Sequence, residues 1–442
     1  MSGLAGRWRA LSPVTRGLCI VVLAGALGLN VLLYVLPRDD RMVALGYTVA
    51  LFTFYADDDS WDPMRSALHY LDENNDTPLY HALLLEKGAK FQYPPTSLLV
   101  AEPLIRTRYG GPPEYRLLNG ISLVAVLATI ALSVVMFERS APPPTSSFDG
   151  RLRIAALAAL GLTFYPLTRA FVLGQIQTWL DLGVAALLFA WCAGKERVAG
   201  VVAGLMAVIK PHYGLVLVWA LLRKRWSVLV AGLLTVAALG AASIARYGLA
   251  NHIDYLWALS FMARVGESYY PNQSVNGLVN RMLFIGNNLD WRAHDYPPFH
   301  PAVYIATVVA SIVLLGTAMF WRSRAPDRGG VTDLMILLLS TTMASSIAWE
   351  HHYGIMLPMF ALVTPALLRL RPCGRWTLGL LVVAYELVSL RLSITNVAAA
   401  THWNFLQSYV LAGALLFLVL LYRLRVREAE ADVSVSLARS QR

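Results

Sequence analysis

The chain has little charge and few cysteines for its length. Of its 442 residues only 14% are charged, whereas 57% are hydrophobic, and the mean hydropathy is +0.53. That is too little charge to cover a soluble core of this size. The three cysteines, Cys19, Cys192 and Cys373, have no metal-like spacing and an odd number, so neither a disulfide nor a metal is implied. These scarcities exclude a water-soluble domain and predict a polytopic membrane protein.

Long apolar windows mark the expected bilayer-crossing helices, each of roughly 17 to 25 residues. They lie at Leu18–Leu36, Tyr115–Phe137, Ile154–Thr168, Gln175–Ala193, Val228–Ile244, Ala302–Trp321, Leu334–Ala348, Tyr353–Leu370, Thr377–Leu392 and Leu406–Tyr422. One further stretch, Val198–Leu222, is interrupted at Lys210, Pro211 and His212, which predicts two short helices meeting at the break. We therefore expect an all-α polytopic membrane protein with about twelve transmembrane helices, built as a single domain over residues 1–442.

The basic residues gather in the connections on one side of these spans. They are Arg7, Arg9 and Arg16; Arg139, Arg151 and Arg153; Lys195 and Arg197; Arg223, Lys224 and Arg225; Arg322, Arg324 and Arg328; Arg369, Arg371 and Arg375; and Arg423, Arg425 and Arg427. Positive loops face the cytoplasm, so both termini, including a tail over residues 424–442, are expected inside a bacterial inner membrane. The same bias explains the net charge of +10 without a nucleic-acid partner.

Two long hydrophilic segments are then expected on the outer face. The first, residues 37–114, carries the acidic run Asp57, Asp58 and Asp59, and is expected to be the catalytic loop. Its short apolar pieces, Met42–Tyr55 and Pro95–Ile105, predict interfacial or re-entrant helices. The second segment, residues 246–301, is expected to bind substrate. An acidic cluster, amides, histidines and a lysine therefore converge on one surface.

Transfer of a sugar from a lipid phosphate to a hydroxyl group requires this set of side chains. One carboxylate takes the proton of the attacking acceptor hydroxyl. The leaving phosphate is a stable anion that needs cations rather than a protonating acid, and such cations are available at Lys210, His351, His352 and Arg281. A single base with a cationic cradle predicts inversion at the anomeric carbon, with no cofactor and no metal.

Other interpretations of the same residues stay open. Asp57 and Asp59 form a DxD pair, which holds a divalent metal on a diphosphate in soluble nucleotide-sugar enzymes, although nucleotide sugars are cytoplasmic and this pair is expected outside. The three acids are otherwise plain solvated loop residues. Lys210 alone at a helix break is equally typical of a side chain that snorkels to the interface. His351 and His352 are equally typical of a helix cap.

The order of motifs along the chain resembles glycosyltransferase family 87, which comprises polyprenol-phosphate-sugar-dependent membrane enzymes of the GT-C fold, including mycobacterial phosphatidylinositol-mannoside mannosyltransferases. The resemblance covers roughly Asp57 to Tyr353. The matching segments are an Asp opening the first outer loop, Phe91-x-Tyr93-Pro94-Pro95, Gly174-Gln175, Lys210-Pro211, Asn272-Gln273-Ser274 and Trp349-x-His351-His352-Tyr353.

The resemblance implies a role for each matched residue. It places the base at Asp59, eight positions before Ala67, with Asp58 as the near alternative. It implies substrate contacts at Tyr93, Pro94, Gln175, Asn272 and Gln273, and a donor phosphate beside the histidine pair. The chain departs from the family pattern at two places: Pro63 replaces an aromatic residue, and Gln177 replaces an Asn.

The sequence thus predicts a glycosyltransferase that moves one sugar, mannose by family resemblance, from a polyprenyl-monophosphate carrier to a glycolipid or glycan acceptor on the outer face. A transporter or flippase of a lipid-linked sugar is the alternative, although such folds often show internal repeats and none is visible here. A ligase that transfers whole polymers from a lipid diphosphate is a third reading.

Overall fold

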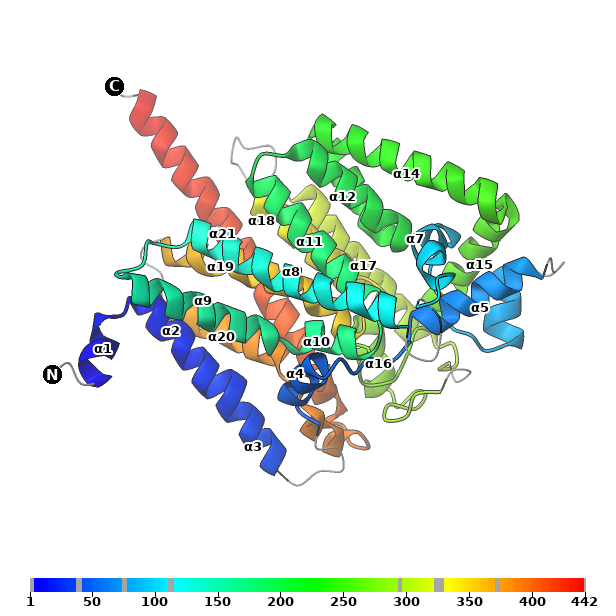
Figure 1. Ribbon diagram of the computed structural model, residues 1–442, viewed down its shortest axis with the longest axis horizontal. Helices are drawn as coiled ribbons and strands as arrows, with labels where there is room; N and C mark the ends of the chain where they lie inside the picture. Colours follow the sequence, from blue (N-terminus) through cyan, green and yellow to red (C-terminus); the bar gives the residue numbers. More distant parts are fainter. Residues whose placement is uncertain are drawn as a thin grey trace.

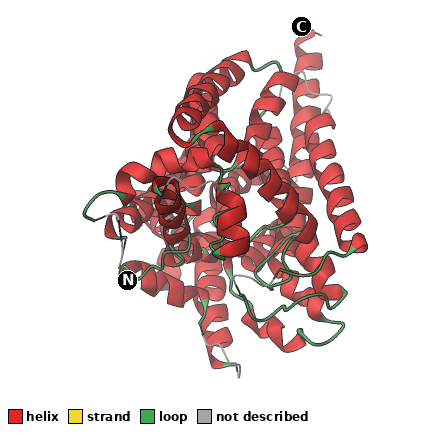
Figure 2. Cartoon of the chain, turned by 90° about the vertical axis from the view of Figure 1, so that its right-hand side faces the viewer, coloured by secondary structure: helices red, strands yellow, loops and turns green. Residues whose placement is uncertain are grey.

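The structure is a computed structural model, and it describes residues 4–36, 42–73, 78–109, 111, 115–292, 296–321, 330–369 and 374–440. Throughout these ranges the regular structure is helical (Figure 2), and the one ladder-type contact is an isolated antiparallel bridge between Asn272 and Trp349. Cys373 and several predicted inner-loop arginines, Arg322, Arg324, Arg328 and Arg371, lie outside the described residues. The chain is an all-α polytopic membrane protein.

The helices have the following bounds. The N-terminal part contains α1 (Leu4–Ala10), α2 (Pro13–Val21), the π-helix η1 (Val22–Leu29), α3 (Asn30–Val35), α4 (Ala44–Phe52), α5 (Trp61–Asp72), α6 (Leu79–His81), the π-helix η2 (Ala82–Glu86), α7 (Pro95–Ile105) and α8 (Arg116–Ser140). The middle contains α9 (Ser147–Leu162), α10 (Tyr165–Val172), α11 (Gln177–Cys192), α12 (Glu196–Ile209), the 3-10 helix η3 (Pro211–Gly214), α13 (Leu215–Leu222), α14 (Trp226–Tyr247), α15 (Leu249–Val265) and α16 (Val275–Met282). The C-terminal part contains α17 (Pro301–Phe320), α18 (Val331–Met343), the 3-10 helix η4 (Glu350–Ile355), α19 (Met356–Arg369), α20 (Arg375–Ser389), the 3-10 helices η5 (Ser393–Ala398) and η6 (Asn404–Ser408), and α21 (Tyr409–Ser440).

The number of helices that meet the length and hydropathy required of a span is smaller than expected. Among the described residues six do so, and these are Pro13–Val35, Arg116–Ser140, Trp226–Tyr247, Pro301–Phe320, Glu350–Arg369 and Asn404–Glu430. A seventh arises if α9 and α10, bent by 52°, form one broken span. The remaining apolar windows end early at Gly, Pro or polar residues, so their helices have only 10 to 17 residues.

The bundle has two distinct ends. In Figure 1, α1 and the end of α21 lie at the left, whereas α5, α7 and α15 lie at the right. The predicted outer segments are more helical than a loop reading suggests, because residues 246–301 contain α15 and α16. The tail predicted at residues 424–442 does not begin at an element boundary, since α21 runs unbroken to Ser440.

Several sequence breaks position the candidate site. Pro166 at the start of α10 has no backbone N–H to continue α9, so the chain bends after Leu162 and α10 begins anew. The predicted break at Lys210 is present, because α12 ends at Ile209 and Pro211 opens η3. Pro94 and Pro95 likewise form the N-cap and first residue of α7, and the short length predicted for Pro95–Ile105 is confirmed.

Candidate active site

The acidic run lies against the turn that follows α10. The backbone N–H of Asp57 donates to the carbonyl of Val172 at 2.7 Å, and that of Asp59 donates to the carbonyl of Leu173 at 3.0 Å. Gly174 has a φ of +64°, and a Cβ atom at this position would lie 2.0 Å from the Asp57 carbonyl oxygen. Only glycine allows both the left-handed backbone and this close approach. The Gly-Gln motif therefore has a steric reason, and it brings α10 to the acidic loop.

The carboxylate of Asp59 is part of a hydrogen-bonded network. The Gln175 amide donates from Nε2 to Asp59 Oδ2 at 2.5 Å. Gln175 Oε1 in turn accepts from Ser60 Oγ at 2.8 Å and from the Tyr93 hydroxyl at 3.0 Å. Because the acceptor side of the Gln175 amide is occupied by two hydroxyls, its donor side is oriented toward Asp59. Three predicted site residues, Asp59, Tyr93 and Gln175, are thus brought together.

The pKa values of two acids rise above the ordinary range. Surrounding protein atoms raise the pKa of Asp59 by desolvating its carboxylate, while the Gln175 hydrogen bond and the Arg169 charge partly offset that rise. Asp59 as a whole residue is nevertheless exposed, so it lies at the surface of the loop and not in the core. The pKa of Asp58 is also raised, by desolvation and by repulsion from Asp62 and Asp57. A raised pKa makes a carboxylate a stronger base.

A cationic cluster lies at the helix break after α12. Lys210 Nζ donates to Gln177 Oε1 at 2.8 Å and lies 2.9 Å from His352 Nε2. Gln177 Nε2 donates to Asp181 Oδ1 at 2.9 Å, so this amide links the lysine to a fully buried carboxylate. The histidine rings of His351 and His352 are 4.7 Å apart. The structure therefore brings Lys210, His351 and His352 together, as the sequence predicted.

The acidic and cationic clusters meet at one short segment. Gln175 contacts Asp59 and Gln177 contacts Lys210, and the two amides are only two residues apart at the start of α11. A second link comes from Thr96, whose hydroxyl donates to the carbonyl of Val208 two residues before Lys210. Asp59 and Lys210 are thus each held by an amide of the same short segment.

Arg169 is a further cation that the sequence analysis missed. Its Nε lies 3.6 Å from Glu350 Oε2, its Nη1 donates to the Tyr47 hydroxyl at 2.7 Å, and its charge acts on the Asp59 carboxylate. Glu350 is fully buried and also accepts from the hydroxyls of Tyr165 and Tyr409. The sequence did contain a signal for Arg169, because this residue directly follows the apolar window Ile154–Thr168. A charged side chain within a membrane span is energetically costly and usually functional.

The predicted substrate amides of the second outer segment are turned toward the protein itself. Asn272 donates to the carbonyls of Glu267 and Ser346 and accepts from the Ala348 N–H. Gln273 donates to the carbonyls of Tyr270 and Gln407, and accepts from the N–H groups that open α21, at Val410 and Leu411. Both side chains are fully buried. They hold residues 267–274 against the segment that carries His351 and His352.

Arg281 and Pro94 also have structural surroundings. Arg281 is 1% exposed, and its guanidinium donates to three backbone carbonyls and to the Ser408 hydroxyl. The Nη1 and Nη2 donors of Arg281 are thus occupied, whereas Nε is buried with no hydrogen-bond partner among the described residues. The structure does not bring this side chain into contact with Lys210. Pro94 is buried and its carbonyl accepts from the Ser97 hydroxyl at 2.8 Å, so its visible role is to start α7 and present Tyr93.

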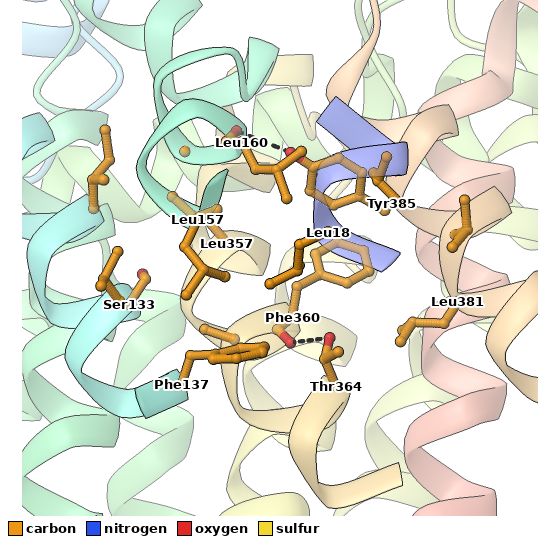
Figure 3. Close-up of a pocket in the computed structure, with 16 residues that line it drawn as sticks. Leu18, Ser133, Phe137, Leu157, Leu160, Leu357, Phe360, Thr364, Leu381 and Tyr385 are labelled. Atoms are coloured by element: carbon orange, nitrogen blue, oxygen red, sulfur yellow. Dashed lines mark hydrogen bonds between the residues drawn. The ribbon is translucent and has the colours of Figure 1, made fainter. Parts of the chain in front are cut away.

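An apolar cavity opens along α19 (Figure 3). It has a volume of about 110 Å³ and is lined by α2, α8, α9, α19 and α20. On α19 it is lined by Leu357, Phe360, Ala361 and Thr364, which share one face of the helix at i, i+3, i+4 and i+7 spacing. Leu357 follows His352 by five residues, and the chain between them passes from the 3-10 helix η4 into α19. The histidine pair and this wall of the cavity are thus carried by consecutive elements.

Comparison with known proteins identifies the family. The family model described as glycosyltransferase family 87 matches residues 91–348, more than half of the chain. This chain belongs to glycosyltransferase family 87. The match includes Tyr93, Gln175, Lys210, Asn272 and Gln273, while Asp59 and the histidine pair lie just outside it.

One relative of this family 87 protein is a named enzyme of Mycolicibacterium smegmatis. It is the polyprenol-phosphate-mannose-dependent alpha-(1-2)-phosphatidylinositol pentamannoside mannosyltransferase, 25% identical over 294 residues. The match covers 66% of this chain and 62% of that protein, which is less than two thirds of its length. No solved structure matches the chain. Within the described residues there is also no group of three or more His, Cys, Asp or Glu side chains arranged to hold a metal ion.

Proposed function

We propose that this protein transfers one sugar from a polyprenyl-monophosphate carrier to a hydroxyl of a glycolipid or glycan acceptor, with inversion at the anomeric carbon. The observation that carries this proposal is the placement of Gln175 and Gln177. One amide holds a single carboxylate, Asp59, and the other, two residues further along, holds Lys210.

In the proposed step, Asp59 accepts the proton of the acceptor hydroxyl as its oxygen attacks the anomeric carbon. The bond from that carbon to the phosphate oxygen breaks, and its electron pair leaves with the phosphate. Lys210, His351 and His352 stabilise the departing anion, with Arg169 as a fourth donor in place of Arg281. Neither a cofactor nor a metal takes part.

The donor and acceptor follow from the chemistry of the site and from the relative. The apolar cavity along α19 suits a prenyl chain whose phosphate lies at the histidine pair. Mannose is the proposed sugar, because the named relative is a polyprenol-phosphate-mannose-dependent mannosyltransferase. We place the reaction at the outer face of a bacterial inner membrane, with both termini cytoplasmic, because of the charge bias of the connections. A GT-C fold with about twelve crossings would require the five shorter apolar helices to cross as well.

Substitution of the acids tests this proposal directly. The purified protein is reconstituted in vesicles with a polyprenyl-phosphate mannose donor and a glycolipid acceptor, and the product is analysed. We expect Asp59→Asn to lower transfer by at least about 10²-fold, the lower end of the contribution of a general base. Asp58→Asn and Asp57→Asn are matched controls that change the same charge next to it, and both should keep most of the activity.

Each other outcome assigns a different function. Full activity of both Asp59→Asn and Asp58→Asn would remove the base from this loop, whereas loss of transfer in Asp58→Asn alone would assign the base to Asp58. Loss of transfer in Asp57→Asn together with inhibition by EDTA would favour the DxD metal reading. Movement of the donor across the bilayer without any product would favour a flippase, and transfer of a polymer would favour a ligase.

A further inference from the structure

A buried ion pair supports an exposed tryptophan between the two outer segments. Lys90 Nζ lies 3.7 Å from Glu267 Oε2, and it also lies 4.5 Å from the ring centroid of Trp291 and 4.5 Å from that of Tyr296. The Lys90 and Glu267 side chains are 11% and 4% exposed, whereas Trp291 is 43% exposed. The lysine lies over the Trp291 ring, so a ligand that approaches from solvent would meet the exposed part of the indole before it meets the ion pair.

The carboxylate of this pair is held firmly in place. Glu267 Oε1 accepts from the N–H groups of Ser268 and Tyr269 at 3.0 and 3.2 Å, which leaves Oε2 toward Lys90. The backbone of Glu267 is held as well, because Asn276 accepts from its N–H and Asn272 donates to its carbonyl. The buried asparagines of the second outer segment thus fix the position of Glu267.

The chemistry of this group favours a neutral, hydroxyl-rich ligand. The lysine charge is compensated by Glu267, so the pair attracts a phosphate or an anionic lipid less than an unpaired lysine would. The ammonium donors and carboxylate oxygens both suit hydroxyl groups. The face of an indole carries partial negative charge and packs against the C–H face of a sugar ring. A neutral sugar residue satisfies all three features.

The group lies within reach of the proposed base. Lys90 precedes Tyr93 by three residues, so their Cα atoms are at most about 11 Å apart even in an extended chain. The Tyr93 hydroxyl bonds the Gln175 amide that holds Asp59. A sugar at Trp291 can therefore belong to the same acceptor molecule whose hydroxyl is activated by Asp59.

We propose that Lys90, Glu267 and Trp291 form an acceptor subsite that binds a neutral sugar residue of the acceptor glycan, remote from the hydroxyl that attacks the donor. This inference rests on the proposed function. The competing role for Trp291 is that of an aromatic anchor at the membrane interface, which would bind no sugar.

The subsite predicts a dependence on acceptor length. Transfer in vesicles is measured with two acceptors, a glycolipid with one sugar and one with several, for wild type, Trp291→Ala, Trp291→Phe and Glu267→Gln. We expect Trp291→Ala to raise KM for the longer acceptor roughly 3- to 10-fold, the size expected for loss of one aromatic contact. KM for the one-sugar acceptor, KM for the donor and kcat should stay unchanged. Trp291→Phe should retain most of the preference for the longer acceptor over the one-sugar acceptor, and Glu267→Gln should lose part of this preference.

The control is Trp403→Ala, which removes an indole that is 64% exposed and packs at a tilted angle against Phe405, with no ion pair beside it among the described residues. It should leave both acceptors unaffected. Equal losses on the two acceptors, or an effect on donor KM, would overturn the subsite. Binding of a soluble mannose oligosaccharide, followed by tryptophan fluorescence in wild type and Trp291→Ala, tests the subsite apart from transfer. Failure of wild type to transfer would overturn the proposed function, whereas equal binding by the two proteins would overturn only the subsite.

Discussion

At the scale of single residues, the proposed catalysis depends on how Gln175 holds Asp59. The amide both orients the carboxylate and lowers its pKa, whereas desolvation raises that pKa. The balance leaves the acid with a pKa above the ordinary value while keeping it solvated enough to ionise. A carboxylate in this state is a better proton acceptor than one in bulk water.

Gln175→Met should change both the orientation and the pKa of the Asp59 carboxylate. Without the hydrogen bond the pKa of Asp59 rises further, so a higher pH is needed to keep the base deprotonated. We expect the acidic limb of the pH profile of kcat/KM to move to higher pH, and kcat at the optimum to fall about 10- to 100-fold through lost orientation. A limb at the wild-type position would show that Gln175 does not contact the titrating group.

Gly174→Ala isolates the steric part of the site. Gly174 and Gly194 both have positive φ, +64° and +68°, but only at Gly174 would a Cβ meet other atoms, namely the Asp57 carbonyl. Gly194→Ala should therefore cost only the left-handed penalty of about 1 to 2 kcal/mol. Gly174→Ala should destabilise more and also displace the acidic run. The two variants are compared by thermal unfolding in detergent and by their transfer activity. Equal losses of stability and activity in Gly174→Ala and Gly194→Ala would contradict the close contact between Gly174 and the Asp57 carbonyl.

Residue types in the sequence indicated side chains that gather in the structure, but not the partners of the amides. Asp59, Tyr93 and Gln175 form one hydrogen-bonded group, and Lys210 and His352 form another with His351 beside it. Asn272 and Gln273 were expected to bind substrate, yet all their hydrogen bonds in the structure go to the backbone. A sequence does not reveal the partner of an amide, because substrate hydroxyls and backbone groups use the same donors and acceptors.

At the scale of elements, the Asn-Gln segment before α16 joins separate parts of the chain. Gln273 connects η6 and the start of α21 to the segment before α16, and the Tyr353 hydroxyl of η4 donates to the Gln273 carbonyl at 2.5 Å. The backbone carbonyl of Gln273 thus holds η4, which carries the histidine pair, while its fully buried side chain holds η6 and α21. Its role is to maintain the relative positions of these elements.

Gln273→Leu should accordingly lower stability. The substitution leaves two backbone N–H groups and two carbonyls without their side-chain partner, at about 1 to 3 kcal/mol for each group that stays unsatisfied. We expect a lower Tm and less folded protein, with an unchanged KM for the donor in the fraction that folds. Asn287→Ala, which removes local bonds in an exposed turn, serves as the control. A normal Tm with a raised KM would instead assign Gln273 to substrate binding.

Helix lengths were harder to predict than helix positions. The break predicted within Val198–Leu222 is present, but the window Ile154–Thr168 is divided between α9 and α10, and the window Gln175–Ala193 forms a helix of only 16 residues. Hydropathy registers apolar residues on both sides of a proline or glycine break, whereas the backbone stops at the break. The count of twelve spans exceeded the six or seven long helices for this reason.

At the scale of the whole molecule, the charge bias predicts which end of the bundle faces outward. α11 starts beside the Asp59 site and contains 16 residues, so the connection after Cys192 lies about 24 Å away along the helix axis. In a background without Cys19, Cys192 and Cys373, an impermeant maleimide should label Asp57→Cys in intact spheroplasts. Glu196→Cys should react only after permeabilisation. The opposite pattern would place the acidic run in the cytosol and contradict the proposed donor.

The turn between α10 and α11 has an evolutionary consequence. Gln175 holds Asp59 and Gln177 holds Lys210, so the spacing between these two contacts is inherited as a single unit. A relative that evolves a new linkage cannot lengthen this turn by one residue without losing one of the two contacts. Differences in product structure among relatives should therefore arise from surface residues that contact the acceptor away from its reacting hydroxyl. Those residues can change while the turn stays the same.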